Sequence, residues 1–252
     1  MKKVFGLVGH SLSHSFSKQY FTNKFNTLQL SDYVYELWEL KDLKNIREFI
    51  HSQGNVVGFN VTIPYKTEII NYLDIITEEV KNINACNCVF VKDNQWIGYN
   101  TDWWGFLKMI ENKLDKHYTS AMILGTGGAS KAVAYALEKL GIQYIFVSRN
   151  EHPTSSNVLS YNELVPEIFD QFTLIINTTP VGMYPDVEDI PPIPINFINE
   201  KHFVIDLIYN PEETKLLHEA KQRGSKILNG FEMLYLQAEK SWYIWQELNE
   251  NE

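Results

Sequence analysis

The sequence predicts an α/β protein made of two halves. In the first half, short apolar strands alternate with helices, the order typical of an α/β sheet. In the second half, a strand runs into a glycine-rich turn that opens a helix, and more apolar strands follow. The length of 252 residues suits one large domain or two small ones, so these patterns, rather than the length, favour two domains.

Alternation and helical spacing of apolar residues define the elements of the first half. The spacing from Leu43 to Ile50 fits one face of a helix, and residues 86–91 and 95–99 look like a hairpin that turns at Asp93. The expected order is a strand at 4–8, a helix at about 16–28, a strand at 33–40, a helix at about 41–53, a strand at 56–62 and then the hairpin.

The second half is expected to begin near Asn100, and a long aromatic helix follows Gly230. Gly141 stops the helix after the glycine-rich turn. The other expected elements are a helix at about 102–113, strands at 121–124, 142–148, 173–179 and 203–209, and a proline-rich surface loop at 185–194. We therefore expect a first domain of residues 1–100, completed by the C-terminal helix 231–252, and a second domain of residues 101–230.

The net charge of −9 argues against nucleic acid and anionic membrane surfaces as partners. No apolar run approaches the ~20 residues that span a bilayer. The apolar run at 4–8 is shorter than the ~7–15 residues of a signal-peptide core, so we expect a cytoplasmic protein. Cys86 and Cys88 are interpreted as small buried side chains, because a disulfide across one residue would be strained and a metal site needs more ligands.

The segment GHSLSHSFSK, residues 9–18, follows the first strand and is dense in serine and histidine. Its residues alone are compatible with a metal site, a phosphate cradle, a phosphorylation tract or a pocket for an anion. A metal site at His10 and His14 is disfavoured, because no third ligand stands at a useful spacing, and we predict no metal.

The segment GTGGAS joins a strand to a helix, which is the context of a dinucleotide-binding turn. Gly125 permits the tight turn, Gly127 lets the backbone approach a pyrophosphate, and the amides at the helix start favour the anion. The alternative is a plain glycine-rich corner between a strand and a helix. The next strand ends Ser148-Arg149-Asn150, where a cofactor without a 2′-phosphate would usually meet Asp or Glu, so the sequence favours NADP over NAD.

Two polar residues stand out near expected element boundaries. In GFNVTIPYK, Lys66 follows a strand, and in GYNTDWWGF, Asp102 opens a helix. By themselves they are typical of a solvated surface lysine and a helix cap. Their combination with other segments is more specific, since GHSLSHSFSK, NVTIPYK, INACNCV, GYNTDWWGF, GTGGASKAV, INTTPVGMYP, VIDLIYNPEET and NGFEMLYLQAEKSW occur in this order. Together, and over nearly the whole chain, they resemble the shikimate dehydrogenase family.

The resemblance implies two α/β domains separated by a cleft, an N-terminal substrate domain and a C-terminal Rossmann-like domain that binds NADP. It implies the reversible NADPH-dependent reduction of 3-dehydroshikimate to shikimate, a step of chorismate and aromatic amino-acid biosynthesis. We expect small-molecule partners only and a monomer or a homodimer. Two rivals remain open: a quinate/shikimate dehydrogenase with relaxed substrate or NAD use, and a non-catalytic ligand sensor on the same fold.

The same resemblance implies roles for individual residues. Lys66 and Asp102 match the catalytic pair, in which the lysine relays a proton or stabilises developing alkoxide charge and the aspartate holds substrate and lysine in place. Ser15 and Ser17 match the pair that binds the substrate carboxylate. The other matching substrate-binding positions are Asn60, Thr62, Asn87, Tyr209 and Gln237. The matching cofactor-binding positions are Gly125, Gly127, Gly128, Ala129, Ser148, Arg149, Thr178, Leu207 and Gly230.

The sequence departs from the family pattern in several places. Lys18 stands where the family usually has proline, so the entry into the following helix is expected to differ, and Cys88 replaces a common threonine. No second basic residue follows Arg149 in EHPTSSN, and Glu151 repels phosphate if it points inward, so the preference for NADP is expected to be weaker than usual. His14 matches a family histidine, to which we assign a structural role.

Overall fold

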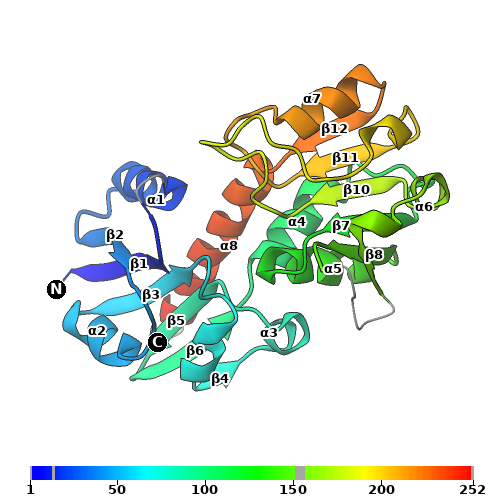
Figure 1. Ribbon diagram of the computed structural model, residues 1–252. Coiled ribbons are helices and arrows are strands. Elements are labelled where there is room, and N and C mark those ends of the chain that lie inside the picture. The colour runs from blue at the N-terminus through cyan, green and yellow to red at the C-terminus, as the bar shows by residue number, and fades with distance from the viewer. Residues whose placement is uncertain (1, 13–14, 151–156, 251–252) are drawn as a thin grey trace. The chain divides into compact units, whose positions relative to one another are not determined.

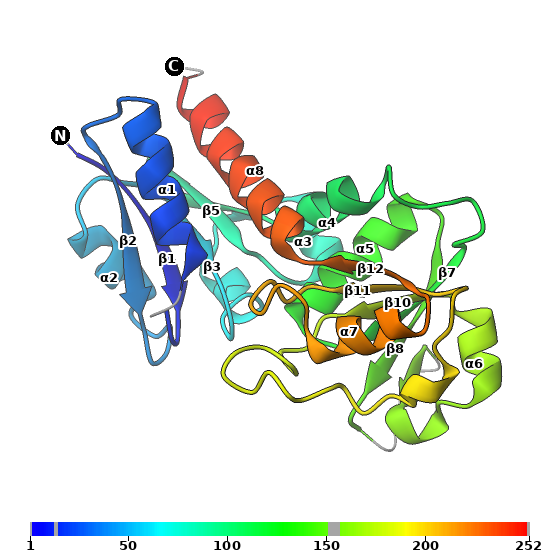
Figure 2. The same ribbon diagram turned by 90° about the horizontal axis from the view of Figure 1, so that it is seen from above.

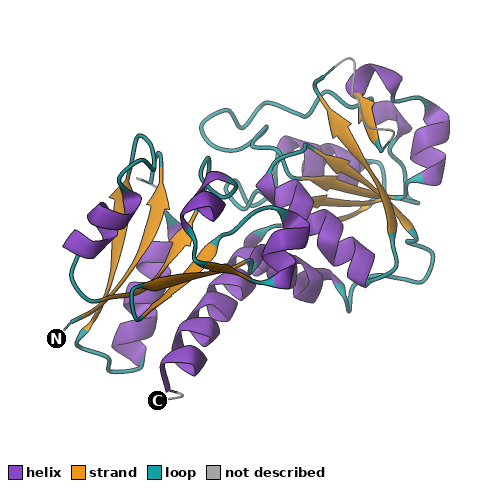
Figure 3. Ribbon diagram, turned by 90° about the horizontal axis from the view of Figure 1, so that it is seen from below, coloured by secondary structure: helices purple, strands orange, loops and turns teal. Residues whose placement is uncertain are grey.

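The computed structural model describes residues 2–12, 15–150 and 157–250. The chain divides into two compact units, of which the first is Met1–Thr101 with Ala238–Glu252 and the second is Asp102–Gln237. Each unit has its own six-stranded sheet with helices packed on it (Figure 3). The predicted α/β fold class is confirmed.

The sheet of the first unit is mixed. Its strands are β1 (Lys3–Gly9), β2 (Tyr33–Glu39), β3 (Val56–Val61), β4 (Ile75–Ile76), β5 (Cys88–Lys92) and β6 (Gln95–Tyr99), in the spatial order β2-β1-β3-β5-β6-β4 (Figure 1). β1 pairs in parallel with β2 and β3, whereas β5 pairs antiparallel with β3 and β6. β5 and β6 form the predicted hairpin, and Asp93 and Asn94 in its turn both have positive φ, as a type I′ turn requires.

Helices cover both faces of this sheet. They are α1 (Phe16–Thr27), α2 (Ile46–Ser52), the 3₁₀ helix η1 (Glu68–Tyr72), α3 (Glu78–Ile83) and the part of α8 (Phe231–Glu250) that begins at Ala238. One face is covered by α1 and α8 (Figure 2). An aromatic cluster that includes Phe5, Phe21 and Trp245 fills this contact. The opposite face packs against α2, η1 and α3 through a second cluster that includes Ile46 and Ile69. The strands of this unit are therefore held from both sides.

The sheet of the second unit is entirely parallel. Its strands are β7 (Ser120–Leu124), β8 (Gln143–Ser148), β9 (Val158–Ser160), β10 (Leu174–Asn177), β11 (Phe203–Asp206) and β12 (Lys226–Asn229). The spatial order is β12-β11-β10-β7-β8-β9, which is the strand order of the Rossmann fold. In this fold, ligands bind where the order reverses, at the carboxyl ends of the two central strands. Those strands are β7 and β10.

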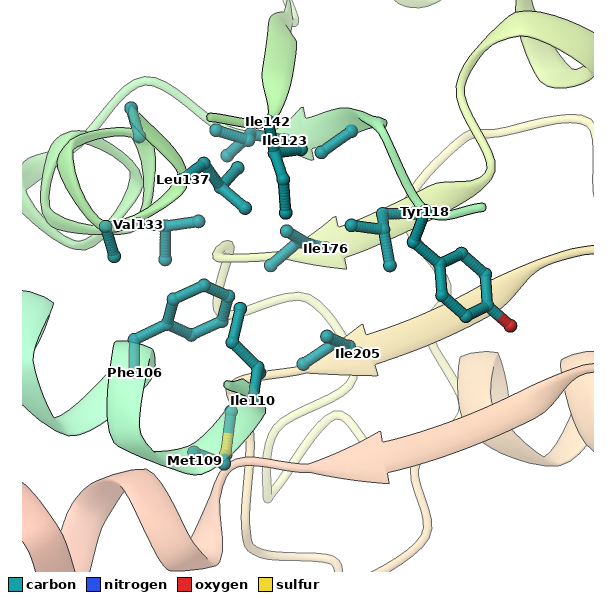
Figure 4. Packing of buried hydrophobic residues seen from close by; sticks show 14 of the residues in the cluster. Phe106, Met109, Ile110, Tyr118, Ile123, Val133, Leu137, Ile142, Ile176 and Ile205 are labelled. Atoms are coloured by element: carbon teal, nitrogen blue, oxygen red, sulfur yellow. The ribbon is translucent and has the colours of Figure 1, made fainter. Parts of the chain in front are cut away.

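The helices of the second unit also lie on both sheet faces. They are α4 (Asp102–Ile110), α5 (Gly128–Lys139), α6 (Pro166–Gln171), α7 (Lys215–Gln222), the 3₁₀ helices η2 (Tyr161–Glu163) and η3 (Ile195–Phe197), and the start of α8. Figure 4 shows Phe106 and Ile110 of α4 and Val133 and Leu137 of α5 packed against strand residues such as Ile123. α6 and α7 cover the other face through Phe169, Leu216 and Leu217. The predicted Rossmann-like architecture of this half is confirmed.

Two helices are shorter than predicted. α2 begins at Ile46 rather than near residue 41, because the Asp42 side chain accepts a hydrogen bond from the Lys44 amide at 3.0 Å, a local turn that competes with the helix. Leu43 is still fully buried, so its apolar spacing was misread as helical. α4 ends at Ile110 and is followed by turns, whereas the prediction extended it to about residue 113.

The prediction also left out the short elements η1, β4, α3, β9, η2, α6, η3, α7 and β12. β4 has two residues and β9 three, too few for an alternating pattern to show. Both cysteines are fully buried, as predicted, and neither is in a disulfide, although Cys86 precedes β5 rather than lying within it. No helix within the described ranges is long and apolar enough to cross a membrane.

Candidate functional site

The topology of the first sheet brings four polar segments to one edge. β1 and β3 are parallel, so both end there, while antiparallel β5 begins there and β6 ends there. The register confirms this, since Asn60 lies opposite Cys88 and Cys88 lies opposite Tyr99. The edge therefore gathers the residues that follow Gly9 and Val61, those that precede Cys88, and those that follow Tyr99.

The first of these segments leads into α1. Ser15 is the N-cap residue of the helix, yet its side chain makes no capping hydrogen bond; the Ser15 amide donates to the Leu12 carbonyl oxygen at 3.0 Å. Ser17 lies in the first helical turn and is half-buried. Lys18, which stands where the family usually has proline, lies on the surface and pairs with Glu36 at 2.9 Å. The helix starts at Phe16 without a proline. His14 lies outside the described residues, so its predicted structural role remains untested.

The second segment carries Thr62 and Lys66 and is held at both ends. The Thr62 amide donates to the Val8 carbonyl oxygen at 2.9 Å, which ties the segment to β1. The Cys86 amide donates to the Lys66 carbonyl oxygen at 2.7 Å. Both Thr62 and Lys66 are half-buried. The lysine backbone is therefore fixed beside the start of the hairpin.

The third and fourth segments are joined by Asn87. Its side-chain oxygen accepts from the Thr101 amide at 2.6 Å, and its side-chain nitrogen donates to the Thr101 hydroxyl at 3.0 Å. Its backbone oxygen accepts from the amide of Val61 at 3.0 Å. Asn87 and Thr101 are both buried. Thr101 is the last residue of the first unit before Asp102, so Asn87 fixes the chain directly before the predicted catalytic aspartate.

Three of the predicted catalytic and substrate-binding residues belong to the second unit. Asp102 opens α4 and is buried, with 6% of its surface exposed. Tyr209 is half-buried, and burial raises the pKa of its phenol. Gln237 lies on α8, and its side-chain nitrogen donates to the Leu234 carbonyl oxygen at 2.8 Å. Because Lys66 and Asp102 belong to different units, their convergence across a cleft stays a prediction.

The glycine-rich turn lies at the switch point of the second sheet. Gly125 has φ +107°, and a Cβ added to it would lie 3.0 Å from the Thr178 hydroxyl oxygen, so glycine is required. That hydroxyl donates to the Leu124 carbonyl oxygen at 2.6 Å and lies 3.0 Å from the Ser130 hydroxyl. A Cβ added to Gly127 would meet no described atom within 4 Å. The turn is therefore closed on the strand side and open above the start of α5.

The amides at this helix start suit a pyrophosphate. Gly127 is the N-cap of α5 and, as a glycine, has no side-chain oxygen of its own to bind the first amides. Gly128 and Ala129 are the first two residues of this helix. Backbone amides at a helix start, a small side-chain volume and the helix dipole together fit an anion. The residues present therefore fit a dinucleotide at this turn.

The end of β8 presents Arg149. The Ser148 hydroxyl accepts from the Asn150 amide at 3.1 Å, which folds the chain into a turn around the arginine. Arg149 is exposed, and its charge lowers the pKa of Tyr161, although burial has the larger effect and raises that pKa. Glu151 lies outside the described residues. Arg149 is thus an exposed residue directly after β8, and its binding of a phosphate stays a prediction.

Gly230 and Leu207 meet after their strands end. A Cβ added to Gly230 would overlap the Leu207 carbonyl oxygen, so only glycine fits. The Gly230 amide donates to the Ile208 carbonyl oxygen at 3.2 Å. The loop after β11 and the start of α8 are therefore locked together.

A buried carboxylate in the second unit was missed by the sequence analysis. Asp206, the last residue of β11, is fully buried and accepts from Asn177 and from the Ile208 amide at 3.0 Å each and from the Thr214 hydroxyl at 2.8 Å. We call Asn177, Asp206 and Thr214 the carboxylate cluster. Burial raises the pKa of Asp206 to about 6, against the opposing effect of the three hydrogen bonds. The aspartate ends an otherwise apolar strand, FVID, and that break in the pattern was the available signal.

Within 2–12, 15–150 and 157–250, no three His, Cys, Asp or Glu side chains are grouped so that they could hold a metal ion. His14, one of the two histidines considered for this role, is not among these residues.

Comparison with known proteins identifies the family. The family model described as the shikimate dehydrogenase substrate binding domain matches residues 7–89. The shikimate dehydrogenase (NADP(+)) of Clostridium beijerinckii is 40% identical over 255 residues, covering 97% of this chain and 92% of that protein. The second of these matches spans nearly the whole chain, and so both the edge of the first sheet and the glycine-rich turn.

Two solved structures are similar in both fold and sequence. Shikimate dehydrogenase 1 from Peptoclostridium difficile has a TM-score of 0.84 and 37% identity, covering 98% of this chain and 92% of that one. Shikimate 5-dehydrogenase from Thermus thermophilus, in complex with NADP(H) and shikimate, has a TM-score of 0.84 and 28% identity, covering 98% of this chain and 94% of that one. The motifs, the two folds and the near full-length similarity agree, and the chain belongs to the shikimate dehydrogenase family.

Proposed function

We propose that the protein catalyses the reversible NADPH-dependent reduction of 3-dehydroshikimate to shikimate. The observation that carries this proposal is the 40% identity, over 97% of the chain, to a protein named shikimate dehydrogenase (NADP(+)). The fold supports it, because one sheet edge of the first unit gathers the predicted polar residues and the second unit has a Rossmann switch point.

In this proposal the first unit holds the substrate. The hydroxyls of Ser15 and Ser17 donate to the substrate carboxylate, and a hydrogen bond to a charged group is worth about 1.5–3 kcal/mol. The amide of Asn87 and the hydroxyl of Thr62 bind the ring hydroxyls. From the second unit, Tyr209 and Gln237 complete the substrate contacts.

The proposed chemistry needs a proton at the C3 oxygen. Lys66 exchanges this proton with the alcohol or stabilises the developing alkoxide charge. Asp102 accepts hydrogen bonds from substrate and lysine and orients both. The position of Asp102 supports this role, because it is buried and directly follows Thr101, whose amide is held by the Asn87 side chain.

NADP supplies the nicotinamide carbon that exchanges a hydride with C3. The amides of Gly127, Gly128 and Ala129 bind its pyrophosphate, and Ser148 and Arg149 bind the adenosine 2′-phosphate. Gly125, Thr178, Leu207 and Gly230 shape the cofactor site by the tight contacts described above.

The test is a spectrophotometric assay of purified protein with shikimate and NADP, followed by absorbance of the reduced nicotinamide. We expect turnover with this pair and less with quinate or with NAD. Faster turnover with quinate or NAD would instead support the relaxed dehydrogenase. Saturable binding of shikimate and NADP by calorimetry, without any reduced nicotinamide, would support the non-catalytic sensor.

We further propose that the enzyme works in the cytoplasm as a monomer or a homodimer. Light scattering coupled to size-exclusion chromatography gives the mass in solution, against 29.4 kDa for one chain. Fractionation of cells that express the protein checks the compartment.

A further inference from the structure

The strands at the switch point of the second unit end in a level row of residues. Asn177 lies opposite Leu124 on β7 and opposite Asp206 on β11. Asp206 in turn lies opposite Asn229 on β12. The residues that follow these four in the chain are all predicted to bind the cofactor: Gly125, Thr178, Leu207 and Gly230. Asn177 and Asp206, in the middle of the row, are fully buried, so any effect they have on the cofactor passes through their neighbours.

Asp206 holds the loop after β11 directly. One of its carboxylate oxygens accepts from the Ile208 amide and from the Asn177 side-chain nitrogen, at 3.0 Å each. The Leu207 amide donates to the Asn177 carbonyl oxygen at 2.9 Å, so the peptides on both sides of Leu207 are fixed. The Ile208 carbonyl oxygen accepts from the Gly230 amide at 3.2 Å. The carboxylate therefore orients the peptide that lies against Gly230.

Asn177 extends this contact to the loop after β10. Its side-chain oxygen accepts from the Thr179 amide at 3.0 Å and from the Thr179 hydroxyl at 2.7 Å. A backbone amide only donates, so the Thr179 amide fixes which end of the asparagine side chain is the oxygen. The nitrogen of this side chain then faces Asp206, to which it donates. Thr179 directly follows Thr178, a predicted cofactor residue.

The side chain of Thr179 reaches the glycine-rich turn. Its hydroxyl donates to Asn177 and accepts from the Val181 amide at 3.3 Å. Its methyl carbon lies 3.1 Å from the position that a Cβ on Gly125 would take. Hydroxyl and methyl stand on one Cβ, so the hydrogen bonds of the hydroxyl also set where the methyl points. Asp206, Asn177 and Thr179, which we call the strand-end chain, thus link the loops after β7, β10 and β11.

We propose that Asp206 and Asn177 are positioning residues for the dinucleotide, which hold the loops after β7, β10 and β11 in one arrangement through Ile208 and Thr179. This inference rests on the proposed function, in which these loops bind NADP. It gives a role to two buried residues that the proposed chemistry does not use. Loops that are already ordered bind a ligand more tightly, because less conformational freedom is lost on binding.

The dissociation constant of NADP, measured by titration calorimetry at pH 8, tests the proposal. Asp206 is ionised at this pH, since its pKa is about 6. Asp206→Ala and Asn177→Ala are each expected to raise the dissociation constant about tenfold, a change of the size that one or two hydrogen bonds make. Asp206→Asn keeps one oxygen for Ile208 and Asn177 and is expected to stay within about threefold of wild type.

Thr179 offers a milder variant, because its side chain is only half-buried. Thr179→Val keeps the shape of the side chain and loses the hydroxyl that contacts Asn177 and Val181. It is expected to raise the dissociation constant of NADP about fivefold. The KM for shikimate is expected to stay within about twofold of wild type, because the serine pair proposed to hold the substrate carboxylate belongs to the first unit.

Two matched controls change the same unit away from the strand-end chain. Thr173→Val is the same substitution directly before β10, at a hydroxyl that has no hydrogen-bonding partner among the described residues. Ser225→Ala removes a buried hydroxyl, directly before β12, that donates to the Asn199 carbonyl oxygen at 2.6 Å. Both are expected to keep the wild-type dissociation constant, although Ser225→Ala lowers stability. Circular dichroism with thermal unfolding shows that each variant is folded.

A double variant distinguishes positioning from a general loss of stability. In an Asn177→Ala background, the Thr179 hydroxyl has already lost its acceptor, so Thr179→Val is expected to raise the dissociation constant by less than about twofold more. The full fivefold effect in this background would overturn the route through Asn177. A rise in Ser225→Ala as large as that in Asp206→Ala would overturn the proposal as well, because the effect would then follow stability alone.

The outcomes also separate this inference from the proposed function, since calorimetry needs no turnover. Wild-type protein that binds NADP without oxidising shikimate contradicts the proposed function, and the dissociation constants of the variants still decide this inference. Active wild-type protein with unchanged dissociation constants in the folded variants overturns this inference alone. If the alanine variants do not fold, Thr179→Val against Thr173→Val decides it, and equal dissociation constants for that pair overturn it.

Discussion

The two units use different polar groups to hold together the loops that carry proposed site residues. Each has a buried polar cluster beside its proposed site. In the first unit hydrogen bonds link Tyr35, Asn60, Ser241, Thr101 and Asn87, which we call the neutral cluster, and the second unit has the carboxylate cluster. Both tie together loops that carry proposed site residues. The neutral cluster uses only amides and hydroxyls, whereas the carboxylate cluster centres on an acid whose pKa burial raises to about 6.

The difference shows which of the two clusters can change its charge near neutral pH. Burial raises the pKa of Tyr35 further above its ordinary value of 10.0, so the neutral cluster has no group that changes charge near neutral pH. Asp206 holds the loop after β11 through the Ile208 amide and the start of α7 through Thr214. An acid in this place makes the loops that the carboxylate cluster holds sensitive to pH, whereas the neutral cluster adds no such dependence.

The largest expected effect tests whether the chemistry belongs to the first unit. Lys66→Ala is expected to lower kcat by about 10²–10⁴, the range typical of an acid–base group, with a smaller change in the KM for shikimate. Steady-state kinetics with shikimate and NADP measure it. The exposed Lys44 provides the control Lys44→Ala, with unchanged kinetics. Near-normal turnover in Lys66→Ala would take this lysine out of the mechanism.

The second prediction concerns the carboxylate cluster. The folded protein keeps the Asp206 proton between pH 3.8 and about 6, where the unfolded chain has released it, so this group stabilises the fold most below pH 3.8 and the contribution is lost as pH rises through about 6. At about 1.4 kcal/mol per pH unit, the loss is at most roughly 3 kcal/mol. Asp206→Asn is expected to remove this dependence.

Urea unfolding between pH 4 and pH 8 checks it. The difference in unfolding free energy between Asp206→Asn and wild type should shift in favour of the variant as the pH rises. The exposed Asp170 of the same unit gives the control Asp170→Asn, for which no such shift is expected. A difference that is constant with pH would show that Asp206 does not titrate in this range.

A third prediction sharpens the assignment of the cofactor to the second unit. Arg149→Ala removes the only basic residue at the end of β8, and is expected to raise the KM for NADP about 10- to 100-fold while changing that for NAD little, since a charged hydrogen bond contributes about 1.5–3 kcal/mol. Arg223→Ala, which breaks an ion pair with Glu219, is the matched control. Equal losses with both cofactors would show that Arg149 does not read the 2′-phosphate.

The smallest expected effect belongs to the serine pair. Ser15→Ala and Ser17→Ala are each expected to raise the KM for shikimate about tenfold, because each removes one hydrogen bond to the carboxylate. Ser52→Ala removes an exposed hydroxyl of the same unit and should change nothing. Initial rates at varied shikimate measure the effect. If neither serine variant alters this KM, the carboxylate binds elsewhere.

Local patterns carried much of the fold. The alternating strands, the hairpin turn at Asp93 and Asn94, and the glycine at 125 are each readable within a few residues, and all are present. The start of α2 was wrong because one side chain, Asp42, competes with the backbone of the helix, and no apolar spacing reports that.

The two polar clusters could not be predicted from the sequence, for a different reason. Tyr35 and Asn60 are 25 residues apart, and Asn60 and Ser241 are 181 apart, so only the register of β2, β1 and β3 and the packing of α8 bring them together. The resemblance supplied Asn60 as a position that binds substrate, but not its hydrogen-bond partners. A family pattern identifies candidate site residues. The donors and acceptors that each residue has not used within the protein decide which further groups it can bind.

In a library of variants, substitutions of Gly230 and of Gly127 are expected to be lost at different selection steps. Any side chain at 230 collides with a backbone oxygen, so its variants disappear when cells are sorted for folded protein. An alanine at 127 collides with no described atom and passes that sort, and it is removed only when the survivors are selected on immobilised nucleotide. The stage at which variants of each position are lost would thus show whether that glycine is needed for folding or for binding the nucleotide.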